Sequence, residues 1–530
     1  MVLAGALMAP PTAHTSLWLL PPLAIGWLVW RLSRATVPAA ALLGAVFGTA
    51  WVSSGVWWLF VSMHRYGGLP AWMAATAVVL LAAALSTYLA LACMAWARWR
   101  SGRLGRDAVL FAALWLLAEW ARGVLFTGFP WAASGYTQVD APLAGLAPWV
   151  GVYGMGAVLA FSGALAGLVC ARSSLFGASP TASSAPAMAD PRSSRRRRRS
   201  VWVPVAGVGL ALLAPGLLRT LDFTESAGTT RVTLLQTAVA QDEKFDPSRL
   251  PGLLEDLSRA LRDSTTPLVV GPETAVPLLP SQLDAFAPGW WSGLSATLAA
   301  AGRTALLGLP LGSFEQGYTN SVVALGAAAN AYRYDKAHLV PFGEFIPTGF
   351  RWFTEMMNIP LGDFSRGPLR APSFAFDGQR LAPNVCYEDL FGEELAVRFI
   401  DPDQAPTALV NVSNIAWFGD TIALPQHQHI SRLRTLEFQR PMLRATNTGA
   451  TVLIDHRGRV THALPFHRRG ALEGVFEGRN GLTPYAWWVS RWGLWPLVAL
   501  AAALCAVAAV QTGLRRRAAA LAATFEGDGP

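Results

Sequence analysis

Long runs of apolar residues constrain this chain more than any other feature, because about 20 such residues in a row can cross a bilayer as a helix. Seven runs reach or approach that length: residues 16–33, 36–62, 69–96, 107–126, 142–170, 201–219 and 485–511. Hydrophobic residues make up 53% of the 530 residues and charged residues only 14%, which is more apolar surface than a soluble protein can bury. The sequence therefore predicts a protein with several transmembrane helices.

The runs are unevenly placed along the chain. Residues 1–220 are predicted to hold six clear spans and, at residues 1–11, a short apolar segment that is a clipped or re-entrant span. Residues 225–480 have the mixed composition of a globular domain. A last span at 484–512 and a tail at 513–530 complete the predicted organisation.

Arginine clusters flank alternate ends of these spans. They lie at Arg31 and Arg34, at Arg98 to Arg106, at Arg172 to Arg199 and at Arg515 to Arg517. Because cytoplasmic loops are enriched in basic residues, these clusters predict the cytoplasmic side and place residues 225–480 on the opposite side of the membrane.

Most of the net charge of +9 comes from these topology-setting arginines. Residues 173–200 are a low-complexity stretch that ends in an arginine run, and we expect a cytoplasmic loop there. The globular part shows no basic surface interleaved with aromatic residues, so nucleic acid is not an expected partner.

Short runs rich in β-branched residues alternate with helical stretches from residue 230 onward, as in RVTLLQTAV, PLVVGPE, LAPNVCYED and ALVNVSN. This alternation predicts an α/β domain with its sheets covered by helices. Several of these strands end in a polar residue, and strand ends are where such folds place their chemistry.

Three polar motifs follow predicted strands. Glu273 lies in VGPETAVP, Lys336 in YDKAHLVPFGEF and Cys386 in NVCYED. Each motif alone is weak, since a glutamate at a strand end is usually a cap, a lysine there is usually solvated and a cysteine is often a small core residue. Together they supply a thiol, a base to deprotonate it and a cation to stabilise an oxyanion. The combination predicts a covalent acyl-enzyme.

Cys386 is also the only cysteine in the predicted globular domain. Cys93, Cys170 and Cys505 fall within or beside predicted spans. A single thiol exposed to an oxidising compartment has no local disulfide partner, which favours a chemical role.

At these motifs the chain resembles the nitrilase superfamily, which uses a Glu-Lys-Cys triad on an αββα sandwich. With spans on both sides of that domain, it is similar to the apolipoprotein N-acyltransferase family. The motifs that carry the resemblance are PETAVP, YDKAHLVPFGEFIP, NVCYED, NVSNIAWFGD, PQHQHISRLRTLEFQRPMLRATNTG, and EWAR followed by TGFPW.

The resemblance implies Glu273 as general base, Lys336 as oxyanion stabiliser and Cys386 as nucleophile, with Glu344, Tyr387 and Glu388 as supporting residues. It implies transfer of an acyl chain from the sn-1 position of a phospholipid, typically phosphatidylethanolamine, to the N-terminal amine of a diacylated apolipoprotein. It also implies a multi-pass protein of the bacterial inner membrane with its catalytic domain on the periplasmic side. We expect no cofactor, no metal and a monomer.

Aromatic residues around the motifs support a lipid substrate, because an apolar rim can admit acyl chains and keep water from a thioester. The candidates are Phe245, Phe342, Phe345, Trp417 and Phe418. The sequence departs from the family at Phe245, Phe345 and Ile415, where tryptophan, tyrosine and aspartate are frequent.

Two alternatives share the triad: a membrane-tethered amidase that uses water as acceptor, and an inactive lipid-binding scaffold. Two other polar pairs are interpreted as structural. His427 and His429 lack the companions of a metal site, and Glu119 and Arg122 are spaced to form an ion pair on a membrane helix.

Overall fold

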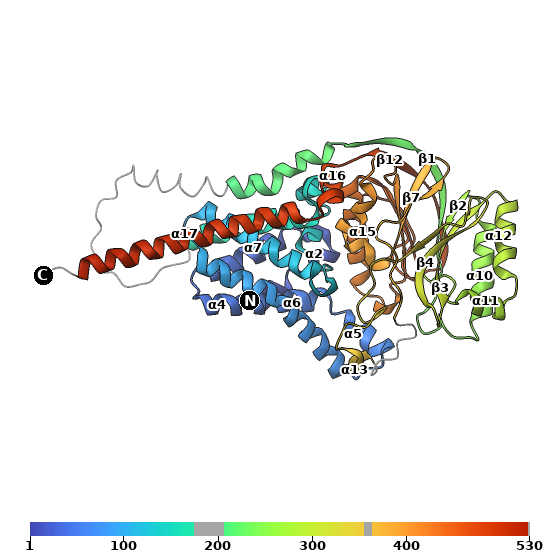
Figure 1. The fold of residues 1–530 in the computed structure, drawn as a ribbon, viewed down its shortest axis with the longest axis horizontal. Helices are drawn as coiled ribbons and strands as arrows, with labels where there is room; N and C mark the ends of the chain where they lie inside the picture. Colours follow the sequence, from blue (N-terminus) through green and yellow to red (C-terminus); the bar gives the residue numbers. More distant parts are fainter. Residues whose placement is uncertain (174–205, 355–362, 528–530) are drawn as a thin grey trace. The chain divides into compact units, whose positions relative to one another are not determined.

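The computed structural model describes residues 1–173, 206–354 and 363–527, and the chain forms two compact units (Figure 1). The helical unit comprises Met1–Val56, Val79–Thr220 and Leu494–Pro530. The sheet unit comprises Trp57–Val78 and Leu221–Gly493. Nearly all of the predicted loop 173–200 lies outside the described residues.

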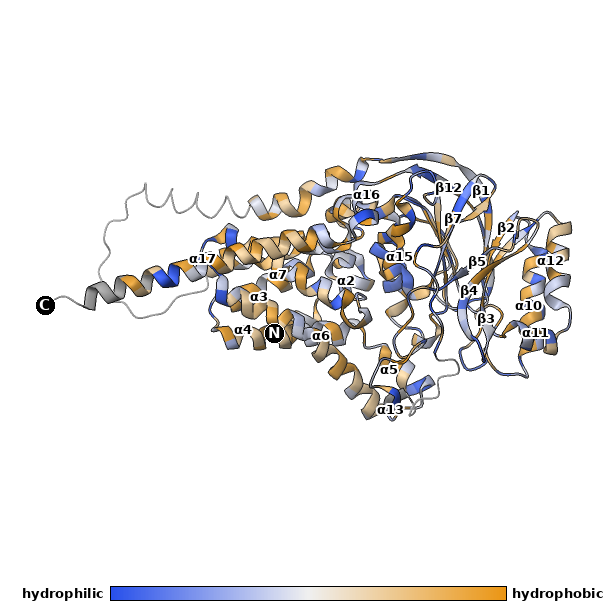
Figure 2. Ribbon diagram, viewed as in Figure 1, coloured by the Kyte–Doolittle hydropathy of each residue, from blue (hydrophilic) through white to orange (hydrophobic). Residues whose placement is uncertain are grey.

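The helical unit is built from apolar helices, drawn mainly in orange in Figure 2. They are α1 (Val2–Ala6), α2 (Pro10–Ala13), α3 (Leu20–Leu32), α4 (Val37–Gly55), α6 (Ala71–Trp99), α7 (Leu104–Val124), α8 (Ala147–Arg172) and α17 (Trp495–Gly527), with 3-10 turns η1 (Thr15–Leu17), η3 (Leu125–Thr127), η4 (Ser134–Gln138), η5 (Pro142–Leu146) and η7 (Ala214–Thr220). Within the described residues, five helices are long and apolar enough to cross a membrane: Val37–Gly55, Ala71–Trp99, Leu104–Thr127, Pro142–Arg172 and Trp495–Ala518.

Of the other predicted spans, only 16–33 is described over its full length. Residues 16–33 form only the 13-residue helix α3, because Pro21 and Pro22 fit only the first turn of a helix. Residues 206–219 of the predicted span 201–219 are described, and they lie within the apolar helix Ala206–Thr220. The N-terminal segment folds into the two short helices α1 and α2.

The structure also corrects the predicted boundaries of the span at 36–62. Helix α4 ends at Gly55, and the following residues, with α5 (Leu59–Val61) and the π-helical turn η2 (Ser62–Tyr66), belong to the sheet unit. Trp58 explains this, since its Nε1 donates to Gln426 Oε1 at 3.0 Å and its ring lies 4.2 Å from that of Phe418.

The sheet unit contains two six-stranded sheets, with strand orders β12-β1-β2-β3-β4-β5 and β11-β10-β9-β8-β7-β6. The first sheet is formed by β1 (Thr224–Gln236), β2 (Leu268–Val270), β3 (Thr304–Ser313), β4 (Gly317–Gly326), β5 (Arg333–Asp335) and β12 (Gly470–Gly481). The second is formed by β6 (Phe374–Phe376), β7 (Gln379–Val385), β8 (Ala408–Ser413), β9 (Met442–Thr446), β10 (Val452–Ile454) and β11 (Val460–Ala463). Strands β1, β2 and β3 run parallel, as do β7, β8 and β9.

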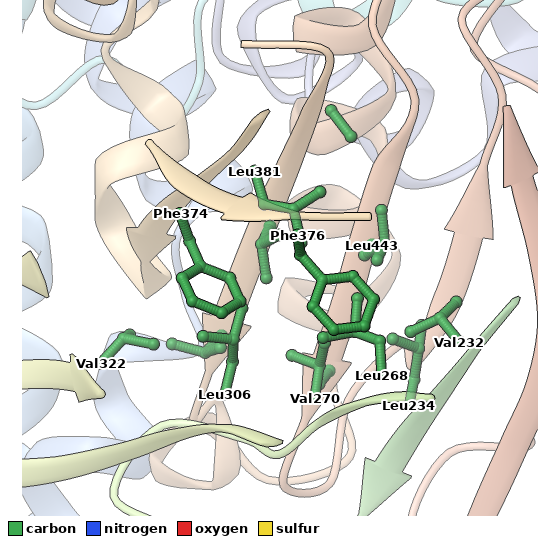
Figure 3. Packing of buried hydrophobic residues seen from close by; sticks show 14 of the residues in the cluster. Val232, Leu234, Leu268, Val270, Leu306, Val322, Phe374, Phe376, Leu381 and Leu443 are labelled. Atoms are coloured by element: carbon green, nitrogen blue, oxygen red, sulfur yellow. The ribbon is translucent and has the colours of Figure 1, made fainter. Parts of the chain in front are cut away.

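Alternation along the strands builds the core between the two sheets. In β2, for example, Leu268 and Val270 face the second sheet, whereas Val269 faces the helices outside the first. Figure 3 shows Val232, Leu306 and other aliphatic residues of the first sheet meeting Phe374, Phe376, Leu381 and Leu443 of the second.

Helices cover the outer face of each sheet. Helices α10 (Leu250–Asp263), α11 (Pro280–Phe286) and α12 (Trp290–Ala300) pack on the first sheet. Helices α14 (Gly392–Ala396), α15 (Ala423–Phe438) and α16 (Pro484–Trp492) supply the layer on the second. The predicted αββα sandwich is therefore confirmed. The Glu273 and Cys386 motifs follow the carboxyl ends of the parallel strands β2 and β7, and the Lys336 motif follows β5, which pairs antiparallel with β4.

Candidate active site

Glu273 is placed by the end of strand β2. Pro272 has no N–H for the sheet ladder, so the chain leaves the sheet there and turns at Thr274, whose φ is 51°. The carboxylate is almost buried, at 7% exposure. Its Oε1 accepts a hydrogen bond from Asn320 Nδ2 at 2.7 Å, and its Oε2 accepts one from the backbone N–H of Asn414 at 2.7 Å. Glu273 is thus held with both oxygens oriented.

Lys336 directly follows strand β5, and its backbone N–H donates to the carbonyl of Asn320 on β4. Its side chain is 1% exposed. The ammonium contacts the two oxygens of Glu344 at 2.9 and 2.8 Å and lies 3.6 Å from Glu273 Oε1. Burial disfavours the charge, but the two carboxylates outweigh it and raise the pKa of Lys336. The cation is therefore permanent.

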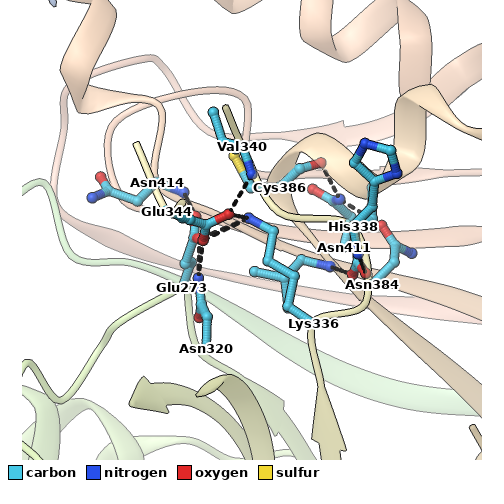
Figure 4. Close-up of polar contacts among 12 residues, drawn as sticks. Glu273, Asn320, Lys336, His338, Val340, Glu344, Asn384, Cys386, Asn411 and Asn414 are labelled. Atoms are coloured by element: carbon cyan, nitrogen blue, oxygen red, sulfur yellow. Dashed lines mark hydrogen bonds and ion pairs between the residues drawn. The ribbon is translucent and has the colours of Figure 1, made fainter. Parts of the chain in front are cut away.

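Glu344 lies in the loop after Lys336 and completes a four-residue cluster (Figure 4). Its Oε2 accepts from the N–H of Val340 at 2.8 Å, and its Oε1 accepts from Asn320 Nδ2 at 2.8 Å. The amide of Asn320 thus bridges Glu344 and Glu273. The sequence did not predict Asn320, because an asparagine inside strand β4 carries no motif of its own.

Cys386 follows the last residue of β7 in a left-handed conformation, with φ at 53°. That conformation is uncommon for a residue with a side chain, and such residues cluster at functional sites. The Cys386 carbonyl accepts from Asn411 Nδ2 at 3.3 Å and from His427 Nε2 at 3.2 Å, which stabilises the turn.

The Cys386 thiol is neutral in the resting site. Burial is the main cause that raises its pKa to about 12, the Glu273 carboxylate raises it further, and the Lys336 ammonium lowers it. Thiolate chemistry at neutral pH therefore requires a base beside the thiol, and Glu273 is the carboxylate that interacts with it most strongly.

Glu388 joins the two loops that carry Lys336 and Cys386. Its Oε1 accepts from the N–H groups of Ala337 and His338 at 2.7 and 3.1 Å. Its Oε2 accepts from Tyr334 Oη at 2.8 Å and from the N–H of Val385 at 2.6 Å. The carboxylate is 4% exposed, so it supports the site by binding β5 to β7.

We expect Glu388→Ala to destabilise the sheet unit by about 3 kcal/mol or more, because it leaves four buried donors without their acceptor. This corresponds to a Tm lower by about 6–12 °C, measurable by thermal unfolding in detergent. Glu394→Ala is the matched control, since Glu394 is 28% exposed and contacts the imidazole of His338 at 2.9 Å. Equal Tm losses in the two variants would contradict this role.

Tyr387, the residue after Cys386, is buried among aromatic side chains. It is 4% exposed, and its ring lies 5.7 Å from that of His338 and 5.2 Å from that of Phe391. The structure therefore places this predicted supporting residue among aromatic neighbours of the lysine loop.

A buried network behind the nucleophile was not predicted. Asp389 accepts from His427 Nε2 at 2.9 Å and from Arg444 Nη1 at 3.2 Å. Arg444 Nη2 lies 2.8 Å from His427 Nδ1, and burial followed by the charge of Arg444 lowers the pKa of the imidazole. A neutral His427 with its proton on Nε2 satisfies all these contacts, including the one to the Cys386 carbonyl.

The aromatic candidates in the lysine loop flank Glu344. Phe342 donates its N–H to the carbonyl of Phe345 at 2.9 Å, and both rings are half-buried. Phe342 packs edge-on against Phe350, and Arg366 lies over the ring of Phe345 at 5.0 Å.

The other aromatic candidates lie on two further loops. Trp417 and Phe418, in the turn η10 (Ala416–Phe418), pack against Tyr66 and Trp58, with ring centroids 5.8 and 4.2 Å apart. Phe245 is half-buried in the loop before α10. A role of these rings in lipid binding stays a prediction.

The polar pairs interpreted as structural have partners of their own. Arg122 and Glu119 form the predicted ion pair at 3.5 Å, and Glu119 also accepts from the backbone and hydroxyl of Ser134. His427 belongs to the network above, and His429 lies 3.2 Å from Arg432. Among the described residues, no three His, Cys, Asp or Glu side chains gather as metal ligands would.

The αββα sandwich and a Glu, Lys and Cys gathered at its strand ends define a member of the carbon-nitrogen hydrolase superfamily. A family profile described as carbon-nitrogen hydrolase matches residues 231–473. A second, described as the apolipoprotein N-acyltransferase N-terminal domain, matches residues 4–165. The two profiles fall on the sheet-bearing and helix-bearing parts of the chain.

The apolipoprotein N-acyltransferase of Verminephrobacter eiseniae (strain EF01-2) is 49% identical over 513 residues, covering 92% of this chain and 91% of that protein. The one from Ralstonia nicotianae (strain ATCC BAA-1114 / GMI1000) is 45% identical over 452 residues, covering 84% and 80%. This chain belongs to the apolipoprotein N-acyltransferase family. It is therefore an acyltransferase and a bacterial membrane protein, and the relationship favours this activity over the water-using amidase.

Among solved structures, a CN-hydrolase superfamily protein from Xanthomonas campestris matches with a TM-score of 0.36 and 18% identity, covering 47% of this chain and 90% of that chain.

Proposed function

We propose that this acyltransferase carries a fatty acyl group on Cys386 between a phospholipid and the N-terminal amine of a diacylated apolipoprotein. One arrangement carries the proposal. The buried Glu273 carboxylate is oriented by two hydrogen bonds, and the Lys336 ammonium lies 3.6 Å from its Oε1. These are the base and the cation that acyl transfer through a thiol requires.

In the first half-reaction, Glu273 takes the proton from the Cys386 thiol, and the thiolate attacks the ester carbonyl at the sn-1 position of the phospholipid. Lys336 stabilises the resulting oxyanion, since its ammonium is fixed before the charge develops. When the intermediate collapses, the C–O bond breaks and the lysophospholipid oxygen takes the proton from Glu273. The products are a thioester and a lysophospholipid.

In the second half-reaction, the α-amino group of the acceptor attacks the thioester. Glu273 takes a proton from the attacking nitrogen, and Lys336 again stabilises the oxyanion. The C–S bond then breaks, the amide is released, and Glu273 returns the proton to the thiolate. The same carboxylate thus acts as base and then as acid in each half.

The place of the reaction follows from the arginine clusters and the apolar spans. We place the sheet unit on the periplasmic side of the inner membrane, with phosphatidylethanolamine as the expected donor and a monomer as the working form. Phe342 and Phe345 on the lysine loop, with Phe245, Trp417 and Phe418, supply apolar surface for the acyl chains.

The test separates the two half-reactions. Purified protein is incubated with phosphatidylethanolamine alone, and we expect lysophospholipid release together with the mass of one acyl group on the peptide that contains Cys386. Adding a diacylated lipopeptide should remove that mass and produce an N-acylated lipopeptide.

The corresponding control is a lipopeptide whose α-amine is acetylated, which cannot accept the acyl group and should leave the thioester in place. Release of free fatty acid at the same rate with either lipopeptide would contradict the proposed acceptor. An acyl group found on a residue other than Cys386 would contradict the proposed carrier.

A further inference from the structure

The chain contains 42 basic residues of the Lys and Arg types, and only two of them, Lys244 and Lys336, are lysines. Both are buried in the same site, at 4% and 1% exposure. Lysine and arginine are interchangeable on most surfaces but not in a tight buried site, because the ammonium is a compact point charge and the guanidinium is a wide planar group. Lys336 belongs to the proposed triad, whereas Lys244 has no role in the mechanism above.

The Lys244 side chain contacts the backbone of the proposed base, Glu273. Its Nζ donates to the carbonyl oxygen of Glu273 at 3.0 Å. Its charge interacts with the Glu273 carboxylate and with the Cys386 thiol; burial lowers its pKa to about 8, and these two groups oppose that effect. The ammonium therefore contacts the backbone of Glu273, and its charge acts on both groups between which the proton moves.

The loop that carries Lys244 is fixed by polar contacts with the same site. Asn447 Oδ1 accepts from the N–H of Val239, and Asn447 Nδ2 donates to the Val239 carbonyl, each at 2.8 Å. Gln241 Oε1 accepts from Asn414 Nδ2 at 2.9 Å, and Asn414 is the residue whose backbone N–H holds Glu273. These hydrogen bonds thus fix the loop that carries Lys244 relative to Glu273.

Lys244 also completes the charge balance of the site. Glu344 contacts the Lys336 ammonium through both oxygens, so it offsets much of that charge. At neutral pH, below the Lys244 pKa of about 8, the two ammonium groups of Lys244 and Lys336 balance the charges of the two carboxylates Glu273 and Glu344. Moving the proton from Cys386 to Glu273 then shifts a negative charge within a neutral cluster. Without Lys244 the cluster would carry an excess negative charge that disfavours the thiolate.

We propose that Lys244 is a positioning residue of the acyl-transfer site, whose ammonium fixes the backbone at Glu273 and balances the negative charge that moves between Glu273 and Cys386. This inference rests on the proposed role of Cys386 as the acyl carrier. The titratable groups that interact with the Lys244 charge are Glu273 and Cys386. Lys336 lies 3.6 Å from Glu273 and pairs with Glu344, while Asp242 and Glu243 on the loop of Lys244 are exposed.

The test measures alkylation of Cys386 by iodoacetamide in detergent, without lipid or acceptor, from about pH 6 to about pH 10, because the rate follows the thiolate fraction. Modification is quantified by mass spectrometry of the peptide that contains Cys386. Lys244→Met removes the charge at similar length. Below about pH 8, where Lys244 is still protonated, we expect its rate profile to lie about one pH unit higher, with alkylation about tenfold slower at about pH 7. Lys244→Gln keeps a donor for the Glu273 carbonyl but no charge, and should move the profile in the same direction.

Arg249→Met is the matched control, since it removes a positive charge from the same loop at a side chain that is 59% exposed. We expect its profile to coincide with that of the unmodified protein. In acylation by phosphatidylethanolamine, Lys244→Met should lower kcat with little change in KM.

A purely structural role gives a different result. If Lys244 only held the loop, its loss would loosen the site, expose the thiol and move the alkylation profile to lower pH, toward an ordinary cysteine near about 8.5. That shift, or unchanged profiles in both neutral variants, would overturn the inference. Because alkylation involves no acyl donor or acceptor, failure of the proposed acyl transfer would leave this test intact.

Discussion

Protein carrying Cys386→Ala will form no acyl thioester at this position and will lose at least about 10⁴-fold in acyl transfer, because alanine has no nucleophile to carry the acyl chain. Cys386→Ser should lose at least about a thousandfold, since a hydroxyl is ionised far less than a thiol even beside Glu273. Both variants should keep the Tm of the unmodified protein, because alanine and serine accept the left-handed backbone at this position about as well as cysteine does. The measurement is single-turnover acylation from phosphatidylethanolamine.

The matched control is Cys170→Ser, which removes an exposed thiol from the helical unit. We expect this variant to acylate Cys386 and to transfer the chain at the normal rate. Acyl transfer that continued undiminished in Cys386→Ala would refute the covalent mechanism.

Replacing Glu273 with glutamine should separate acyl transfer from the reactivity of the thiol. Transfer should fall at least about a thousandfold, because an amide cannot take and return the proton in either half-reaction. Alkylation of Cys386 by iodoacetamide at pH 8 should become faster, because the Glu273 charge is one of the groups that raise the thiol pKa. The variant would thus be more reactive toward a simple electrophile and nearly inactive toward its substrate.

The control for Glu273→Gln is Glu315→Gln, which removes an exposed carboxylate from the same unit. Its transfer rate and alkylation profile should match those of the unmodified protein. Slower alkylation in Glu273→Gln would mean that the carboxylate does not raise the thiol pKa, and it would contradict the electrostatic account of the resting site.

The sequence predicted the fold well where the pattern is local. Alternation of aliphatic residues in strands such as β2 places one face toward the second sheet and the other toward helices, and this follows from the two-residue period of a strand. The ends of these strands were visible as motifs, so Glu273, Lys336 and Cys386 could be named in advance. The spans were less predictable, since 16–33 and 36–62 are mostly apolar yet form the shorter helices Leu20–Leu32 and Val37–Gly55.

Most of the residues that hold these three in position could not be predicted. Asn320 bridges Glu273 and Glu344, and Lys244 reaches Glu273 across 29 residues. His427 was visible only as half of a histidine pair, although it supports the Cys386 turn from 41 residues away. No local sequence pattern around these three residues indicates which distant residue each of them contacts.

The amino-acid order alone therefore determined that the chain crosses membranes, that it carries an α/β domain, and which thiol, carboxylate and ammonium are candidates for chemistry. Hydrophobic length and strand periodicity are local properties, so they can be read along the chain. Only the tertiary structure decided that Trp57–Val78 joins the sheet unit, that Asn320 and Glu388 bind the loops together, and that a second ammonium lies beside Glu273. Those features depend on burial and on contacts between distant residues, which exist only after the two sheets have packed together.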